Sequence, residues 1–161
     1  MTQESPLTQT VSANHAVELP EHHFSQPHKS VILVADDDAL VRNLVTQLMQ
    51  REGYSVLSAV DGHEGLVLSR QYPGAIDLVI TDVQMPRLNG TDLCTYLLEE
   101  RPGIKALVMS CADTGEGAGE DADWPFLPKP SDGQVLIAIV RAVLAASVQS
   151  PVHWLPTNPL T

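Results

Sequence analysis

Acidic side chains follow two apolar, strand-like segments of this chain. Asp36, Asp37 and Asp38 come directly after the first segment, and Asp82 ends the second, residues 76–81. Gathering like charges costs free energy unless a cation or a chemical task offsets it. If both strands lie in one parallel sheet, their carboxyl ends meet at the same edge, where open α/β sheets build their sites. The pattern predicts a metal-assisted acidic pocket with Asp82 at its centre.

Two further polar residues end later strand-like segments. Ser110 follows the apolar run 107–109, and Lys129 follows residues 126–128. Oxygen-rich clusters suit Mg²⁺, which keeps several waters and shares the rest of its coordination shell with phosphate. An ammonium and a hydroxyl at the same edge can hold phosphoryl oxygens. Asp82 is then placed to act as a carboxylate nucleophile that forms an aspartyl phosphate.

The elements that must position these residues alternate between strand and helix. Short apolar runs predict strands over 31–35, 54–59, 76–81, 105–110 and 126–129. Apolar stripes at helical spacing predict helices from Leu40 to a stop at Gly53, over 62–72, over 91–100, and from an N-cap at Asp132 to about Ser147. Asp38 is likewise expected to cap the helix that follows it.

This alternation predicts an α/β fold with a doubly wound, five-stranded parallel sheet of the flavodoxin-like kind. Right-handed crossovers place helices on both faces, and the expected strand order is 2-1-3-4-5. The topological switch point of that order lies between strands one and three. Those are the two strands that end in carboxylates, so topology and chemistry agree.

Composition narrows the function further. The chain has 161 residues, which suits one domain with tails, and 43% of them are hydrophobic, enough for a packed core. Its formal net charge is −11 with no run of Lys or Arg, which argues against binding nucleic acid or an anionic membrane through a basic face. No apolar stretch is long enough to span a bilayer, and no secretory signal is visible. We therefore expect a cytoplasmic setting.

The motifs, taken in order, resemble the receiver domains of two-component response regulators. The resemblance is carried by the string 32–38, which includes Asp36-Asp37-Asp38, by Thr81-Asp82-Val83-Gln84-Met85-Pro86, by Asn89-Gly90, by Ser110 and by Lys129-Pro130. It covers about residues 30–147, and four motifs at the ends of successive strands are highly specific. It implies a receiver domain over 29–148. Residues 1–28 show no sustained periodicity and are expected to be a flexible N-terminal tail, and residues 149–161, which contain three prolines, a C-terminal tail.

The resemblance implies a phosphoacceptor site that depends on Mg²⁺. Asp82 would accept a phosphoryl group from a sensor histidine kinase or a histidine phosphotransfer protein. Asp36 and Asp37 would help to place Mg²⁺, with Asp37 a direct ligand alongside Asp82 and the main-chain carbonyl of Gln84. The protein would not be an enzyme beyond self-catalysed phosphorylation and dephosphorylation of Asp82.

The resemblance also assigns residues to the phosphoryl group and to signalling. Ser110 and Lys129 would hold the phosphoryl oxygens, and the Lys129–Pro130 peptide would be cis. Phe126 matches the aromatic switch position of the family; because it has no hydroxyl, it would signal through rotamer packing alone.

Gln84, Cys111 and Ala112 are expected to modulate the site. Cys111 stands where the family usually has a smaller residue. Its thiol could narrow the access of small phosphodonors or attacking water and change the lifetime of the phosphoryl group, or it could be inert buried filler.

Two segments depart from the family pattern. Residues 111–123 contain three glycines and no Leu, Ile, Val or Met, so we expect a reduced or missing fourth helix there. The last helix is apolar on nearly every side. We expect it to offer a surface for a homodimer or for partner docking, unless the C-terminal tail with Trp154 covers it.

Three functions compete at this point. The first is a stand-alone phosphoacceptor receiver that acts through protein contacts, expected because about a dozen residues follow the last helix. The second is a receiver-like binding module that works without phosphorylation. The third is a phosphatase of the haloacid dehalogenase type, which also uses a carboxylate nucleophile and Mg²⁺ but places that nucleophile after strand one. Mutation of Asp82 separates the first from the third.

Overall fold

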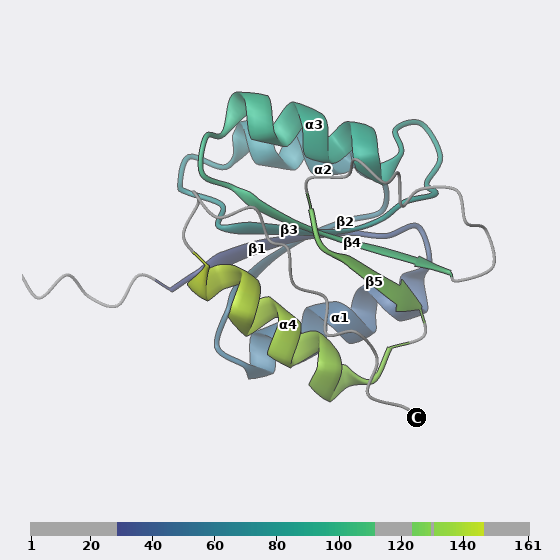
Figure 1. Cartoon of the computed structure of the whole chain (residues 1–161). Helices are drawn as coiled ribbons and strands as arrows, with labels where there is room; N and C mark the ends of the chain where they lie inside the picture. The colour runs from purple at the N-terminus through teal and green to yellow at the C-terminus, as the bar shows by residue number, and fades with distance from the viewer. Residues whose placement is uncertain (1–28, 112–123, 130, 147–161) are drawn as a thin grey trace, which may run out of the picture.

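Five parallel strands form a single sheet with helices on both faces (Figure 1). The computed structural model describes residues 29–111, 124–129 and 131–146. The strands are β1 (Val31–Ala35), β2 (Ser55–Ala59), β3 (Leu78–Asp82), β4 (Lys105–Cys111) and β5 (Phe126–Lys129). The helices in these ranges are α1 (Ala39–Arg51), α2 (Gly62–Gln71), α3 (Gly90–Glu100) and α4 (Gly133–Ala145). The strand order is β2-β1-β3-β4-β5, so the predicted fold class is confirmed.

The sheet separates two hydrophobic cores. Figure 1 shows α2 and α3 on one face of the sheet and α1 and α4 on the other. Alternate residues of β1 serve the two cores: Val31 and Leu33 pack in the first, Ile32 and Val34 in the second, and all four are at most 4% exposed. A sheet that is covered on both faces needs apolar residues at every strand position. This explains the unbroken apolar runs in the sequence.

Polar side chains fix where the helices begin. Asp38 accepts hydrogen bonds from the N–H groups of Leu40 and Val41 at the start of α1. Asp132 accepts from the N–H of Gln134 at the start of α4. Such caps satisfy N–H groups that have no partner within the helix. Both predicted caps are confirmed.

The switch point brings the two acidic strand ends together. β1 and β3 are neighbours, with Leu33 opposite Val79 and Ala35 opposite Thr81. Asp82 itself lies in β3 and is paired with Met109 of β4, so this strand begins and ends later than the predicted 76–81. The backbone of Asp82 is therefore positioned by its pairing with β4 and not by the loop that follows β3.

Parts of the prediction fall outside the described residues. These are the reduced fourth helix in 112–123, the peptide to Pro130, Ala112, and both tails. The domain limits 29–148 therefore remain a prediction. Within the described ranges, no helix is both long enough and apolar enough to cross a membrane.

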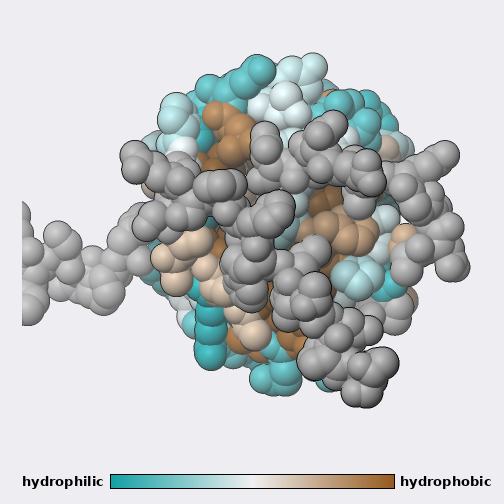
Figure 2. Space-filling model, in the orientation of Figure 1, coloured by the Kyte–Doolittle hydropathy of each residue, from teal (hydrophilic) through white to brown (hydrophobic). Residues whose placement is uncertain are grey.

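The last helix packs on the sheet through one face. Its buried residues are Leu136, Ile137, Val140 and Val143. On the outer face Val135 is 47% exposed, and Ala138 and Ala145 are also exposed. Figure 2 shows brown, apolar residues over part of α4 on this side of the molecule. The outer face thus combines Val135 and small apolar side chains with two exposed polar residues, Gln134 and Arg141.

Arg101, just after α3, joins that helix to the end of α2. Its Nε donates to Oγ of Ser69 at 2.8 Å, and Nη1 donates to the carbonyl of Gly74 at 2.7 Å. Nη2 donates to the carbonyls of Tyr72, at 2.7 Å, and of Ser69. Carbonyls at a helix C-terminus have no partner within the helix, and this guanidinium supplies one.

We predict that Arg101→Ala lowers the free energy of unfolding by about 2–3 kcal/mol, because several partly buried carbonyls lose a charged donor at once. Urea unfolding monitored by circular dichroism measures this loss. Arg70→Ala is the matched control, because Arg70 also joins α2 to α3 but pairs with Glu100 in solvent. An equal loss in both variants would contradict the role given to Arg101.

Candidate functional site

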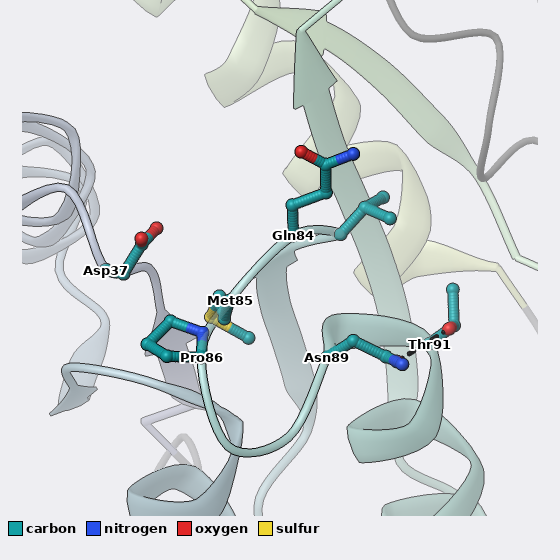
Figure 3. A pocket seen from close by; sticks show the side chains of 7 residues that line it. Asp37, Gln84, Met85, Pro86, Asn89 and Thr91 are labelled. Atoms are coloured by element: carbon teal, nitrogen blue, oxygen red, sulfur yellow. Dashed lines mark hydrogen bonds between the residues drawn. The ribbon is translucent and has the colours of Figure 1, made fainter.

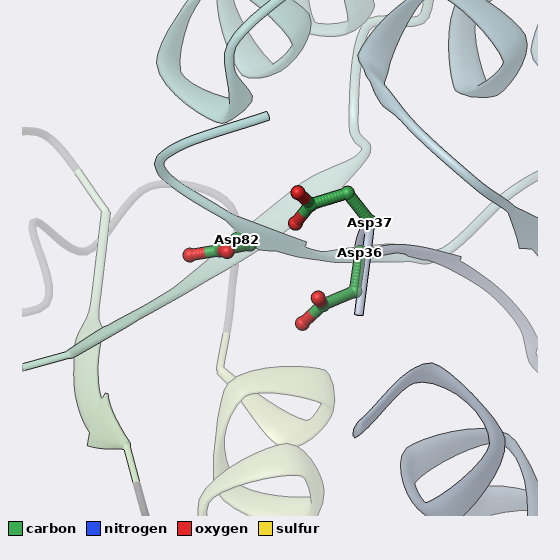
Figure 4. A group of neighbouring side chains, drawn as sticks. All are labelled: Asp36, Asp37 and Asp82. Carbon is green, nitrogen blue, oxygen red and sulfur yellow. The ribbon is translucent and has the colours of Figure 1, made fainter. Parts of the chain in front are cut away.

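Three carboxylates meet at the carboxyl edge of the sheet (Figure 4). Asp36 and Asp37 follow β1, and Asp82 ends β3. One carboxylate oxygen from each lies within 4.8 Å of the others. Asp36 is buried, Asp82 is half-buried and Asp37 is exposed. The predicted acidic pocket is therefore assembled from the predicted strand ends, with one side open to solvent.

Lys129 reaches this cluster from the end of β5. Its Nζ lies 2.5 Å from Oδ2 of Asp36 and 3.3 Å from Oδ2 of Asp82. Its side chain is only 10% exposed. One ammonium against three carboxylates leaves an excess of negative charge. An all-oxygen donor set with that excess fits a hard divalent cation such as Mg²⁺.

Burial and charge act against each other on the two most buried groups. Burial raises the pKa of Asp36 above its ordinary value of 3.8, although the Lys129 ammonium and the N–H of Asp38 oppose the rise. Burial alone would lower the pKa of Lys129, but its hydrogen bond to Asp36 and the charges of Asp36 and Asp82 raise it overall. Lys129 therefore remains a fixed cation at neutral pH.

The backbone around Asp36 is held from several directions. Its N–H donates to the carbonyl of Ala59 at 3.2 Å, and its own carbonyl accepts from Nη1 of Arg42 at 2.7 Å. Its Oδ1 accepts from the N–H of Asp38 at 2.9 Å. The buried carboxylate is thus oriented before any ligand arrives.

The loop from β3 to α3 forms the opposite wall of the site (Figure 3). It contributes Gln84, Met85 and Pro86 to a pocket that also includes Asp37. The loop closes at Gly90, whose N–H donates to the carbonyl of Val83 at 2.9 Å. A methyl group on Gly90 would collide with the carbonyl of Asp82, so glycine is needed for this close approach.

Four further predicted residues lie on β4, on β5 and in the loop after β3. The hydroxyl of Ser110, which is buried, donates to the carbonyl of Cys111 at 3.3 Å. Cys111 is exposed, which disagrees with the alternative of buried filler. Phe126 is half-buried and packs on the core beneath α2 and α3. The side chain of Gln84 is exposed and points away from Asp37 in Figure 3.

An apolar groove beside the site was not predicted. It occupies about 560 Å³ between α1 and α4 and opens onto Asp82 and Lys129. Its apolar lining comes from Val41, Leu44, Val45, Leu48, Met109 and Leu136. The apolar stripe in the sequence predicted the helix α1 itself, and in the structure Leu40 is 82% and Leu44 57% exposed. Helical spacing shows that residues share a face, but not whether a second helix covers that face.

Known proteins match this chain over the described fold. The family model for the response regulator receiver domain matches residues 32–141. The DNA-binding transcriptional regulator NtrC of Azospirillum brasilense is 36% identical over 132 residues, which cover 80% of this chain and 27% of that protein. The response regulator MprA of Mycolicibacterium vanbaalenii is 38% identical over 120 residues, covering 70% of this chain and 49% of that protein.

Solved structures of receiver domains are also similar to this chain. The receiver domain of the hybrid histidine kinase CckA is 34% identical, with a TM-score of 0.57, and the match covers 71% of this chain and 99% of that one. A receiver domain from Clostridium thermocellum is 30% identical, with a TM-score of 0.61, and the match covers 71% and 94%.

The chain spans about a quarter to a half of the length of these curated relatives, whereas it spans nearly all of the solved receiver domains. Receiver domains partner with histidine kinases, and they are phosphorylated signalling modules rather than conventional enzymes. On the family match, the structural likeness and the acidic cluster at the switch point, this chain belongs to the response regulator receiver domain family.

Proposed function

We propose that Asp82 accepts a phosphoryl group from a histidine kinase or a histidine phosphotransfer protein in Mg²⁺-dependent two-component signalling. The observation that carries the proposal is the position of Lys129, whose ammonium contacts both Asp36 and Asp82 inside an acidic cluster. A metal site alone needs only the carboxylates. A largely buried ammonium beside Asp36 and Asp82 suits a phosphoryl group, which brings further negative oxygens.

The chemistry follows from these positions. A carboxylate oxygen of Asp82 forms a bond to phosphorus while the bond from phosphorus to the donor imidazole nitrogen breaks, and the electron pair returns to that nitrogen. Lys129, 3.3 Å from Asp82, balances charge on the incoming phosphoryl oxygens. Ser110 would turn its hydroxyl from the carbonyl of Cys111 toward the same group.

We infer that Mg²⁺ would be held by Asp37, Asp82 and the main-chain carbonyl of Gln84, with Asp36 assisting. The support is the gathering of the three carboxylates within 4.8 Å. When bound, the ion would neutralise negative charge on the phosphoryl oxygens. Asp37 is exposed and can meet a hydrated ion, whereas buried Asp36 keeps Lys129 in place.

Asp82→Asn tests the acceptor. With Mg²⁺ and acetyl phosphate, the wild-type chain should gain the mass of one phosphoryl group and the variant none, because an amide is not a carboxylate nucleophile. Intact mass spectrometry measures the gain. Asp38→Asn is the matched control, because it keeps an N-capping side chain outside the cluster.

The alternatives give other outcomes of the same experiment. A phosphatase of the haloacid dehalogenase type would still be labelled after Asp82→Asn. A binding module that works without phosphorylation would leave even the wild-type chain unlabelled. Either result would contradict the proposal.

Lys129→Gln separates phosphoryl binding from metal binding. Without the ammonium the cluster is more negative, so Mg²⁺ should bind at least as tightly as in the wild type. The rate of labelling should fall by about a hundredfold, because the charge that stabilises the transferring oxygens is gone. Calorimetric titration and labelling kinetics measure the two effects. Loss of Mg²⁺ affinity with an unchanged rate of labelling would contradict this assignment, because Lys129 would then support metal binding and not phosphoryl transfer.

The groove between α1 and α4 supports a protein donor. Leu44 projects an exposed apolar side chain at the rim of a groove that opens onto Asp82. An exposed apolar surface beside a reactive group marks a docking site. We infer that the helix carrying the donor histidine rests on α1 while the imidazole reaches Asp82.

Leu44→Asp should therefore slow phosphotransfer from a histidine phosphotransfer protein by about tenfold or more. Labelling by acetyl phosphate should be unchanged, because a small donor needs no groove. Leu98→Asp on α3 is the control, because that exposed leucine lies on the other side of the sheet. Equal slowing with both donors would place the effect on the site rather than on docking.

The finer expectations remain predictions. Packing of Phe126 as the switch, modulation by Gln84, Cys111 and Ala112, and the cis peptide at Pro130 would all act on the phosphorylated state. Self-association through α4 is supported only by the apolar part of its outer face, where Val135 is the large exposed hydrophobic residue. The stand-alone organisation and the cytoplasmic setting are likewise predictions.

A further inference from the structure

The loop between β3 and α3 is tied to the start of α2 by one arginine. Nε of Arg87 donates to Oδ2 of Asp61 at 2.6 Å, and Nη2 donates to the same oxygen. The side chain of Asp61 is only 4% exposed. Its other oxygen caps α2 by accepting from the N–H of Glu64 at 2.9 Å. One buried carboxylate thus serves both the helix and the loop.

Arg87 also adopts an unusual backbone conformation. Its φ is 68°, and among the described residues it alone combines a positive φ with a side chain other than glycine's. Residues with a Cβ disfavour this region and occupy it where the surroundings require it. The next residue of the loop packs closely against α2, because a methyl group on Gly62 would collide with the carbonyl of Leu88. The start of α2 therefore rests directly on the backbone of this loop.

The same loop carries part of the candidate site. It leaves Asp82, passes through Gln84 and returns at Gly90, which is bonded to the carbonyl of Val83 at 2.9 Å. The return at Gly90 fixes one end of the loop, and the contact from Arg87 fixes its outer part. Between these two anchors lies the main-chain carbonyl of Gln84, the group proposed to face the cation.

We propose that the Arg87–Asp61 ion pair is a latch that positions the loop 83–89 for cation binding. Arg87 is a positioning residue, since its guanidinium points to α2 rather than to the carboxylate cluster. The inference rests on the proposed function, because the Gln84 carbonyl is a ligand only if the site binds Mg²⁺. Groups that orient metal ligands from outside the coordination shell typically change metal affinity by about 10–100-fold.

Calorimetric titration of the whole chain with Mg²⁺ alone tests the latch. Arg87→Ala and Arg87→Gly both remove the guanidinium, but only glycine also relieves the strain of the positive φ. Both should weaken Mg²⁺ binding by about tenfold, and Arg87→Lys, which keeps a cation, should recover part of the loss. Wild-type affinity in Arg87→Gly would overturn the latch, because backbone conformation rather than the ion pair would then control the loop.

A double variant tests whether Arg87 acts through Asp61. Asp61→Asn keeps a capping oxygen for α2 but removes the ionic partner. Combined with Arg87→Ala, it should weaken Mg²⁺ binding no further than Arg87→Ala alone, because both changes remove the same contact. An additive loss would overturn the coupling.

The control is Arg70→Ala. Arg70 has nearly the same exposure as Arg87, 56% against 57%, but its partner Glu100 lies on α3, away from the loop. Its loss should leave Mg²⁺ affinity unchanged, and an equal weakening would overturn the latch. A wild-type chain that binds no Mg²⁺ would overturn the proposed function and the latch with it. Normal wild-type binding with unaffected Arg87 variants would overturn the latch alone.

Discussion

Mutual repulsion of carboxylates is the constraint on which this structure depends. The strand order makes β1 and β3 neighbours, and their register brings Asp36 and Asp82 to one edge with Asp37 beside them. Lys129 is held between Asp36 and Asp82, but a single ammonium leaves negative charge unbalanced. Such a cluster is unfavourable for folding unless something else binds there. A divalent cation would offset the negative charge of the cluster, and it would also balance the negative oxygens of an incoming phosphoryl group.

The protein surrounds this charge with two kinds of support. On the buried side, the N–H of Asp36 donates to the carbonyl of Ala59, and the carbonyl of Asp36 accepts from Arg42. These hydrogen bonds keep the carboxylate of Asp36 oriented toward Lys129. On the open side, Asp37 is exposed and the loop after β3 is closed by a glycine that no larger residue can replace without displacing Asp82. Rigid positioning of charged groups combined with one open side is what a transfer site requires. The exposed leucines of α1 continue this open side into a surface suited to a larger donor.

Much of this could be predicted because parallel sheets convert sequence order into position. Runs such as Val31–Ala35 are apolar at every residue because both faces of the sheet are covered, and polar residues mark where they end. Strand order then places Asp36 beside Asp82. The pair between Arg87 and Asp61 gave no such signal, because it joins two loops 26 residues apart and no periodicity relates them. The exposure of Leu44 could not be predicted for a different reason. Helical spacing shows which residues share a face, but not whether another element covers that face.

A crystal structure of the chain with Mg²⁺ and beryllofluoride would test the central claim most directly. We expect beryllium bonded to a carboxylate oxygen of Asp82, a fluorine in contact with the ammonium of Lys129, and Mg²⁺ on Asp37, Asp82 and the main-chain carbonyl of Gln84. Beryllofluoride on Asp36 or Asp37 would contradict it. So would a structure in which Lys129 keeps its contact with Asp36 while Asp82 remains unmodified.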